Sequence, residues 1–210
     1  MSNNTSPRVR LFAWTVLGLV LAAVAGLFLR AQLHKSSLPH LSQVQSFQLT
    51  NQMGQVITAR DFTGKVWVGD IIFCRCGGPC PKMTEEMSKL QKLIPPDPSL
   101  RFVTVTTDPE YDTPSILKMY GEKFGADFSR WMFLTGTKAE IKTLAVDSWK
   151  LAAFEKDKAE RESENDLFIH STMFVLIDKA GSMRGVYESL EPGFEEKIRA
   201  DVLSLLKETP

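Results

Sequence analysis

The sequence has few cysteines and histidines and no surplus of charge of either sign. It contains 3 Cys and 3 His in 210 residues, which excludes a small scaffold held together by several disulfides. Lys and Arg number 25, and so do Asp and Glu, so no basic excess is present to bind a phosphate backbone. This balance argues against nucleic-acid binding as the main function. Hydrophobic residues make up 43% and charged residues 24%, which is typical of a globular chain.

Long uncharged runs are also scarce, and the clearest one lies near the amino terminus. Residues 11–29 read LFAWTVLGLVLAAVAGLFL and carry no charge. At about 1.5 Å per residue, a helix of this length crosses most of a bilayer core. Ala23-Val24-Ala25 resembles the cleavage site of a signal peptide, but the apolar residues continue to Leu29, which favours an uncleaved anchor. We therefore expect a transmembrane helix at 11–29.

The flanks of this segment suggest a bacterial inner membrane. Positive charges lie on both sides of it, so they do not set its orientation alone. The first ten residues do not form an Arg-rich transit helix, which argues against an organelle. We expect residues 1–10 in the cytoplasm, 30–46 as a polar linker, and 47–210 as one domain facing the periplasm. His34 and His40 are expected to be solvated linker residues.

Hydrophobic periodicity in the soluble part predicts an α/β fold with a mixed central β-sheet flanked by helices. The charged stretch 155–166 is expected to be a solvated loop. Expected strands lie at 47–50, 55–58, 65–73, 102–106, 132–134, 168–178 and 183–187, and expected helices at 81–93, 114–124, 137–146 and 191–207.

A cysteine loop separates the expected strand at 65–73 from the next expected helix. Residues 74–81 read CRCGGPCP, and the Gly and Pro residues predict a loop. Cys80 lies at the expected helix start, where unpaired N–H groups and the helix dipole favour a thiolate. Cys76 lies four residues earlier and can fold back over Cys80. The pair can form a disulfide, or it can bind a soft metal such as Cu(I) or zinc through two sulfurs.

A third ligand would complete a trigonal copper site, and the expected domain contains one histidine. His170 lies in the expected strand at 168–178. Imidazole suits copper, although a single buried histidine is often structural. Both interpretations of His170 remain open from the residues alone.

Several motifs together resemble the Sco (SenC) family, the membrane-anchored thioredoxin-like copper proteins of cytochrome c oxidase assembly. GKVWVGDIIFCRCGGPCPKMTEEM is similar to the signature region of that family. Residues 108–114, DPEYDTP, resemble its DPERDTP segment, and 120–136, YGEKFGADFSRWMFLTG, resemble the family's next segment along the chain. His170-Ser171-Thr172 resembles the region of the metal-binding histidine. The resemblance extends from about Phe47 to Leu205.

The resemblance implies a thioredoxin-like fold and a copper site. Cys76 and Cys80 match the CxxxC pair of the family, so they would be a redox-active pair and copper ligands, with His170 as the third ligand. The copper would be Cu(I), Cu(II) or both. The implied activity is delivery of copper to the dinuclear copper centre of cytochrome c oxidase, or reduction of the cysteines of that centre. The implied partner is the copper-bearing oxidase subunit or another copper chaperone.

Two residues depart from the family pattern. Cys74 stands where Thr is common, so it could compete for Cys76 as a disulfide partner, supply a third sulfur, or simply replace Thr as a small buried side chain. Asp70 interrupts an apolar strand, where it needs a partner or a position at the wet end. We expect Asp108 and Asp112 to serve in turn and cap chemistry. Met83 and Met87 are expected in the core, and Trp67, Trp131 and Trp149 are expected as core residues or surface anchors.

The alternative function is a membrane-tethered thiol–disulfide oxidoreductase that acts on a protein substrate. Dedicated thioredoxin-type oxidoreductases resemble CxxC proteins with a Pro just before a late strand. Here three residues separate Cys76 from Cys80, and no Pro occurs between Leu167 and Asp178. Both features favour copper binding. A peroxidase on the same fold would need neither His170 nor a paired CxxxC.

Overall fold

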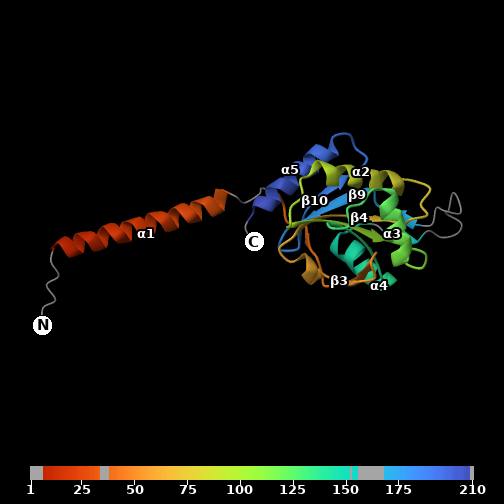
Figure 1. Ribbon diagram of the computed structural model, residues 1–210, viewed down its shortest axis with the longest axis horizontal. Helices are drawn as coiled ribbons and strands as arrows, with labels where there is room; N and C mark the ends of the chain where they lie inside the picture. The colour runs from red at the N-terminus through yellow and green to blue at the C-terminus, as the bar shows by residue number, and fades with distance from the viewer. Residues whose placement is uncertain (1–6, 34–37, 152, 156–167, 209–210) are drawn as a thin grey trace. The chain divides into compact units, whose positions relative to one another are not determined.

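The computed structural model describes residues 7–33, 38–151, 153–155 and 168–208, and it divides into two units. One unit contains the amino-terminal helix, and the other is a folded unit from Leu38 to Leu206 (Figure 1). His34 and most of the charged stretch 155–166 lie outside the described residues.

The amino-terminal helix α1 spans Pro7–Leu33 and contains the whole uncharged run at 11–29. Its described apolar side chains are exposed, with Leu11, Phe12 and Trp14 at 68%, 71% and 70%. Counted over the described residues alone, no helix combines the length and the apolar character needed to cross a bilayer.

The folded unit is built on a mixed sheet, as the sequence predicts. Within the described residues its strand order is β1-β10-β9-β4-β5-β6-β2-β3. The pairs β4–β5 and β5–β6 are parallel and the other pairs are antiparallel. A separate ladder joins β7 (Ala153–Glu155) to β8 (Phe168–His170). The strands of the large sheet are β1 (Ser42–Gln43), β2 (Gln48–Asn51), β3 (Val56–Thr58), β4 (Val66–Ile72), β5 (Leu100–Thr106), β6 (Trp131–Thr135), β9 (Met173–Ile177) and β10 (Ser182–Glu188).

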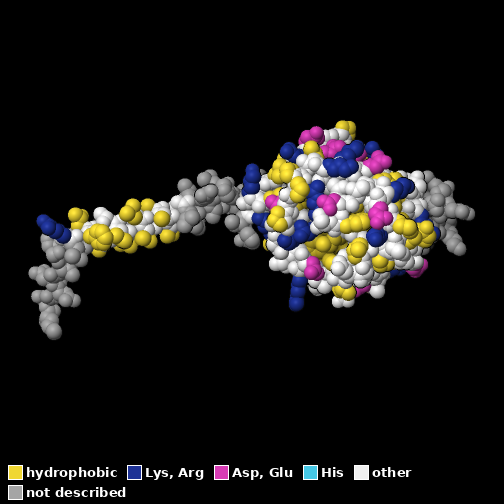
Figure 2. All heavy atoms as spheres, viewed as in Figure 1, with side chains coloured by type: hydrophobic (Ala, Val, Ile, Leu, Met, Phe, Trp, Pro, Cys, Tyr) yellow, Lys and Arg dark blue, Asp and Glu magenta, His cyan; other side chains and the backbone are white. Residues whose placement is uncertain are grey.

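Helices cover both faces of this sheet. Figure 1 shows α2 and α5 on one side of β4 and β9, with α4 on the other. The helical segments are the 3₁₀ turn η1 (Ala59–Phe62), α2 (Cys80–Leu93), α3 (Pro114–Lys123), α4 (Lys138–Lys142), its π-helical continuation η2 (Thr143–Ser148) and α5 (Phe194–Lys207). On the face of the folded unit drawn in Figure 2, basic and acidic side chains are interspersed.

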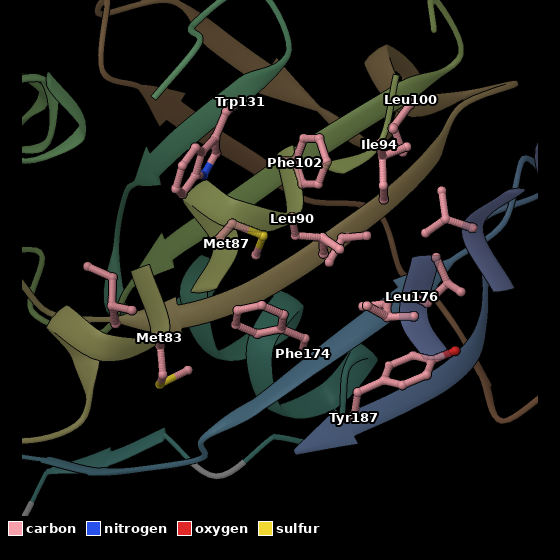
Figure 3. Close-up of a cluster of buried hydrophobic side chains, with 14 of the residues drawn as sticks. Met83, Met87, Leu90, Ile94, Leu100, Phe102, Trp131, Phe174, Leu176 and Tyr187 are labelled. Carbon is pink, nitrogen blue, oxygen red and sulfur yellow. The ribbon is translucent and has the colours of Figure 1, made fainter. Parts of the chain in front are cut away.

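Strand β4 divides the apolar residues into two cores. Successive side chains of a strand point to opposite faces. Val66, Val68 and Ile72 therefore belong to the core that contains residues of α2, α3 and α5, and Trp67 and Ile71 to the core under η1, α4 and η2. The first core is drawn in Figure 3. All seven residues of β4 are buried, which makes it the central strand of the fold.

Most expected elements are present, with shifted ends. Helix α2 starts at Cys80 rather than at Pro81, which takes the second helical position. The expected strand at 168–178 is interrupted between β8 and β9. The expected helix at 137–146 begins with the predicted capping box of Thr137 and Glu140.

The folded unit also starts earlier than expected. Residues 30–46 are expected as a linker, but the folded unit begins at Leu38 and β1 pairs with β10. The buried Arg184 guanidinium donates to the carbonyl oxygens of Leu38 and Pro39, at 2.8 and 3.0 Å, and forms an ion pair with Asp178 at 2.8 Å. His40 is exposed, and its Nδ1 lies 2.9 Å from Ser182 Oγ.

Candidate metal and thiol site

The three cysteines lie just beyond the carboxyl end of β4. The strand ends at Ile72, and the backbone N–H of Cys76 donates to the carbonyl oxygen of Phe73 at 3.1 Å. This hydrogen bond closes a tight turn just beyond the carboxyl end of the strand. Helix α2 then begins at Cys80, so the loop between strand and helix is short and contains Cys74 and Cys76.

The structure brings the Cys76 and Cys80 thiols together, as the sequence predicts. A side-chain hydrogen bond joins them, and all three cysteines are present as thiols. Cys76 is half-buried, whereas Cys80 has no exposed surface. The backbone N–H of Gly78 also donates to Cys76 Sγ at 3.3 Å.

The expected thiolate at Cys80 is wrong for this state of the protein. Its position at the helix start is confirmed, but the hydrogen bond to Cys76, burial and the negative charges nearby raise the pKa of Cys80. The hydrogen bond to Cys76, together with burial, therefore opposes the favourable helix dipole at this position. Cys80 is therefore the sealed member of the pair, and Cys76 is the member that contacts solvent.

Cys74 is bound to the acidic segment rather than to the other cysteines. Its backbone N–H donates to Asp112 Oδ2 at 3.0 Å. Burial, followed by the negative charge of Asp112, raises the pKa of the Cys74 thiol. A neutral, half-buried thiol suits a structural role for Cys74, as a small side chain in place of Thr, better than a role as a third thiolate ligand.

The acidic segment at 108–114 holds the cysteine loop in place. Asp112 also accepts a hydrogen bond from the Thr106 hydroxyl. Asp108 Oδ2 forms an ion pair with Arg75, 2.7 Å from its Nη2, and Arg75 lies 4.5 Å from the centroid of the Tyr111 ring. The expected turn is present, because the N–H of Asp112 donates to the carbonyl oxygen of Asp108 at 2.8 Å. The sequence contains no signal for the additional contacts to the loop.

The third expected ligand lies outside what the structure describes. The backbone of His170 ends β8 and pairs with Ala153, but its side chain is not described. Among the described side chains, no three His, Cys, Asp or Glu groups form a cluster that could hold a metal. Convergence of His170 on the two thiols therefore stays a prediction.

The methionines of α2 are core residues, as expected. Met83 and Met87 have no exposed surface and lie among apolar side chains of α2, β5 and β9 (Figure 3). Trp67, Trp131 and Trp149 are also buried.

Asp70 has neither of the environments that the sequence predicts. It has no exposed surface, and neither of its carboxyl oxygens has a hydrogen-bond partner. Burial raises the pKa of Asp70 to about 7, and the hydroxyl of Thr104, its register partner in β5, offsets only part of this effect. Asp70 is therefore a buried acid whose charge changes near neutral pH.

These features define a class: a thioredoxin-like α/β domain with a thiol pair where a central parallel strand passes into a helix. The sequence profile of the SCO1/SenC family matches residues 36–207, and the chain belongs to that family.

Relatives and solved structures agree with this assignment. The SCO1 protein homolog of Bacillus subtilis is 33% identical over 77% of this chain and 82% of that protein. A relative from Stutzerimonas stutzeri, 28% identical over 70% of each chain, is named for copper binding. Among solved structures, a SCO1/SenC family lipoprotein from Bacillus anthracis is 34% identical, with a TM-score of 0.68 over 78% of this chain and 95% of that one.

A second solved structure is of a relative for which a disulfide switch is described. BsSco, described as a member of the Sco family of cytochrome c oxidase assembly proteins in which a disulfide switch was identified, is 32% identical to this chain. Its TM-score is 0.70 over 81% of this chain and 97% of that one.

The buried acid leads to a prediction about stability. A carboxyl whose pKa is about 7 in the folded state and about 3.9 when unfolded stabilises the fold below pH 4 and loses this contribution as the pH rises through 7. The free energy of unfolding of Asp70→Asn, relative to that of the parent, should therefore rise as the pH increases from 4 to 7. At pH 8 the variant should be more stable than the parent by up to about 4 kcal/mol. Urea unfolding at pH 4, 6 and 8 measures the difference.

The matched control is Asp127→Asn. Hydrogen bonds from Ser129 hold the pKa of Asp127 below its ordinary value, with burial opposing them, so this substitution should bring no gain at pH 8. A difference between Asp70→Asn and the parent that stays constant from pH 4 to 8 would contradict the assignment of a raised pKa.

Proposed function

We propose that this protein is a membrane-anchored copper metallochaperone that binds copper through Cys76, Cys80 and His170. The single observation that carries the proposal is the convergence of the Cys76 and Cys80 thiols at the end of β4, in a chain of the SCO1/SenC family. Two thiolates favour Cu(I), and imidazole is also a copper ligand. The copper-binding name of the Stutzerimonas stutzeri relative supports the same conclusion.

Copper is the transported metal, and Cys76 and Cys80 have different roles in binding it. Cys76 receives hydrogen bonds from Gly78 and Cys80 and is the accessible sulfur. Cys80 has to lose a proton to become a ligand, so acid should weaken binding. Copper leaves by ligand exchange with a target of higher affinity. We propose that this target is the dinuclear copper centre of cytochrome c oxidase, or another copper chaperone.

A second candidate is thiol–disulfide exchange on a protein substrate, including the cysteines of the oxidase copper centre. The observation that favours it is the asymmetry of the pair. A half-exposed sulfur lies against a sealed one, an arrangement that suits attack by Cys76 and resolution by Cys80. The disulfide switch described for BsSco supports this candidate.

We also propose that α1 anchors the protein in the inner membrane, with residues 1–10 in the cytoplasm and the folded unit in the periplasm. The uncharged run at 11–29 and its exposed apolar side chains support the anchor, and the Bacillus anthracis relative, a lipoprotein, supports membrane association. Binding of a lipid bilayer to such a surface would remove apolar area from water.

The copper site predicts a distinct loss for each variant. The reduced full chain, in detergent and without oxygen, should bind one Cu(I) per chain against a competing chelator. Cys76→Ser and Cys80→Ser should each weaken binding at least about 100-fold, more than the loss of an outer partner. His170→Ala should also lower the affinity for Cu(I), because it removes the third ligand. Cys74→Thr is the matched control, and it should bind Cu(I) like the parent.

The two functions separate in the same experiment. Retained affinity in Cys80→Ser would contradict the copper site. If the parent binds no copper tightly but reduces a disulfide substrate, the metallochaperone function is rejected and the oxidoreductase function is favoured.

The anchor predicts the fractionation and the mass of the protein. In a bacterial host, the chain should stay with membranes after carbonate washing and keep its full length, whereas a variant with Leu17→Glu and Leu21→Glu should be extracted. Charged residues at the centre of a spanning helix cost about 2.5–3.5 kcal/mol each. A mature chain beginning near Gly26 would instead identify a cleaved signal peptide.

A further inference from the structure

The amino end of β9 lies at the same edge of the sheet as the cysteine loop. Strand β9 runs antiparallel to β4, and Gly69 is opposite Val175. Each step forward along β4 therefore corresponds to one step back along β9. When this register is continued beyond the ladder, Ile72, the last residue of β4, is level with Thr172. The chain that leads from β8 into β9 thus reaches the sheet beside the start of the cysteine loop.

Thr172 is held at this edge by the end of β10. Its hydroxyl donates to Glu188 Oε2 at 2.7 Å, and the other carboxyl oxygen of Glu188 accepts the N–H of Leu190 at 3.4 Å. The N–H of Ser189 donates to the carbonyl oxygen of Thr172 at 3.0 Å, and the Ser189 hydroxyl donates to the same oxygen. Ser189 has no exposed surface, so this side of the contact is shielded from water. We call Thr172, Glu188 and Ser189 the β9 clamp.

The β9 clamp extends beyond the regular pairing of β9 with β10. The last pair of that ladder is Met173 opposite Glu188. Thr172 lies before this pair, in the short segment between β8 and β9, and the clamp joins it to the end of β10 and to the next residue, Ser189. His170 lies two positions before Thr172 and ends β8. The clamp therefore ties the chain to the large sheet only two positions from His170.

Strand β8 needs this support, because its own pairing is short. Among the described strands it pairs with β7, and their ladder has three register pairs, from Ala153–His170 to Glu155–Phe168. A two-stranded ladder of this size is at best marginally stable in water without further packing. The β7–β8 ladder alone therefore does not fix the backbone of His170 relative to the large sheet, and a contact of the large sheet close to His170 is required.

We propose that Thr172 is a positioning residue for the ligand His170; this rests on the proposed copper site. Held by Glu188 and Ser189, Thr172 fixes the backbone two positions from His170, at the edge of the sheet where the cysteine loop begins. A third ligand whose backbone is held near the thiols before copper arrives loses less conformational entropy when copper binds. Thr172 acts through His170 and is not itself a ligand.

The inference predicts a loss of Cu(I) affinity that depends on His170. Thr172→Val removes the hydroxyl but keeps the shape of the side chain, and it should lower the affinity about 10- to 100-fold, as for other residues that orient metal ligands. Thr172→Ser keeps the hydroxyl and should bind Cu(I) like the parent. In a His170→Ala background, Thr172→Val should bring no further loss, because the ligand that Thr172 positions is absent. Competition with a Cu(I) chelator measures these affinities on the reduced full chain in detergent, without oxygen.

The matched control is Thr58→Val. The Thr58 hydroxyl donates to Asp61 Oδ2 at 2.8 Å, so this variant loses the same kind of hydrogen bond. Thr58 ends β3, which lies at the opposite edge of the sheet from β9 and β10, so the Cu(I) affinity should not change. If Thr172→Val lowers the affinity equally with and without His170, the effect is a general structural one and the inference is overturned, while the copper site stands. An unchanged affinity in Thr172→Val would overturn the inference too.

A measurement on the metal-free protein separates failure of the inference from failure of the proposed function. Hydrogen exchange of the backbone amides at 168–172, followed by mass spectrometry, reports how firmly this part of the chain is held. Thr172→Val should exchange faster there than the parent, and Thr58→Val should exchange like the parent. Equal exchange in Thr172→Val and the parent would overturn the inference on its own. A parent that binds no Cu(I) would reject the proposed function instead.

Discussion

The burial of β4 on both faces determines the geometry of the site. Its parallel ladder to β5 and its antiparallel ladder to β9 fix the point at which the chain leaves the sheet. Tight packing reinforces this position, because a Cβ added at Gly69 would lie 2.7 Å from Trp149 Cη2. With the strand end fixed, the loop has to turn back within a few residues before α2 begins, and this turn places Cys76 against Cys80.

Three buried acids near this loop, Asp70, Asp108 and Asp112, have different partners and so different roles. Asp108 is neutralised by Arg75, and Asp112 accepts hydrogen bonds from Cys74 and Thr106, so both hold the loop. Asp70 has no such partner and lies in an apolar core. The same residue type thus holds the loop in two places and is a buried acid without a hydrogen-bond partner in the third.

The mixed sheet, the strand at 65–73 and the approach of Cys76 to Cys80 could be predicted from the sequence. They depend on hydrophobic periodicity and on local turn residues, which act over a few positions. The raised pKa of Cys80 could not be predicted. The helix dipole is visible in the sequence, whereas the hydrogen bond to Cys76 and the burial of α2 against distant strands appear only in the fold.

Long-range pairing explains the other differences. Residues 38–46 contain few apolar residues and look like a linker, but their backbone pairs with β10, and Arg184 binds Leu38 and Pro39 from about 145 positions away in the chain. Arg75 likewise carries no signal in the sequence, because its partner Asp108 lies on another loop. The position of Asp70 is unusual already in the sequence, but only the fold shows that it has no partner.

The central claim is that copper is bound by the two thiolates and an imidazole, and X-ray absorption spectroscopy of the copper(I)-loaded full chain tests it most directly. The account predicts two sulfur ligands and one nitrogen ligand at copper, with the nitrogen lost in His170→Ala. Three sulfur ligands and no nitrogen in the parent would contradict the role of His170, and a copper centre without sulfur would contradict the account altogether.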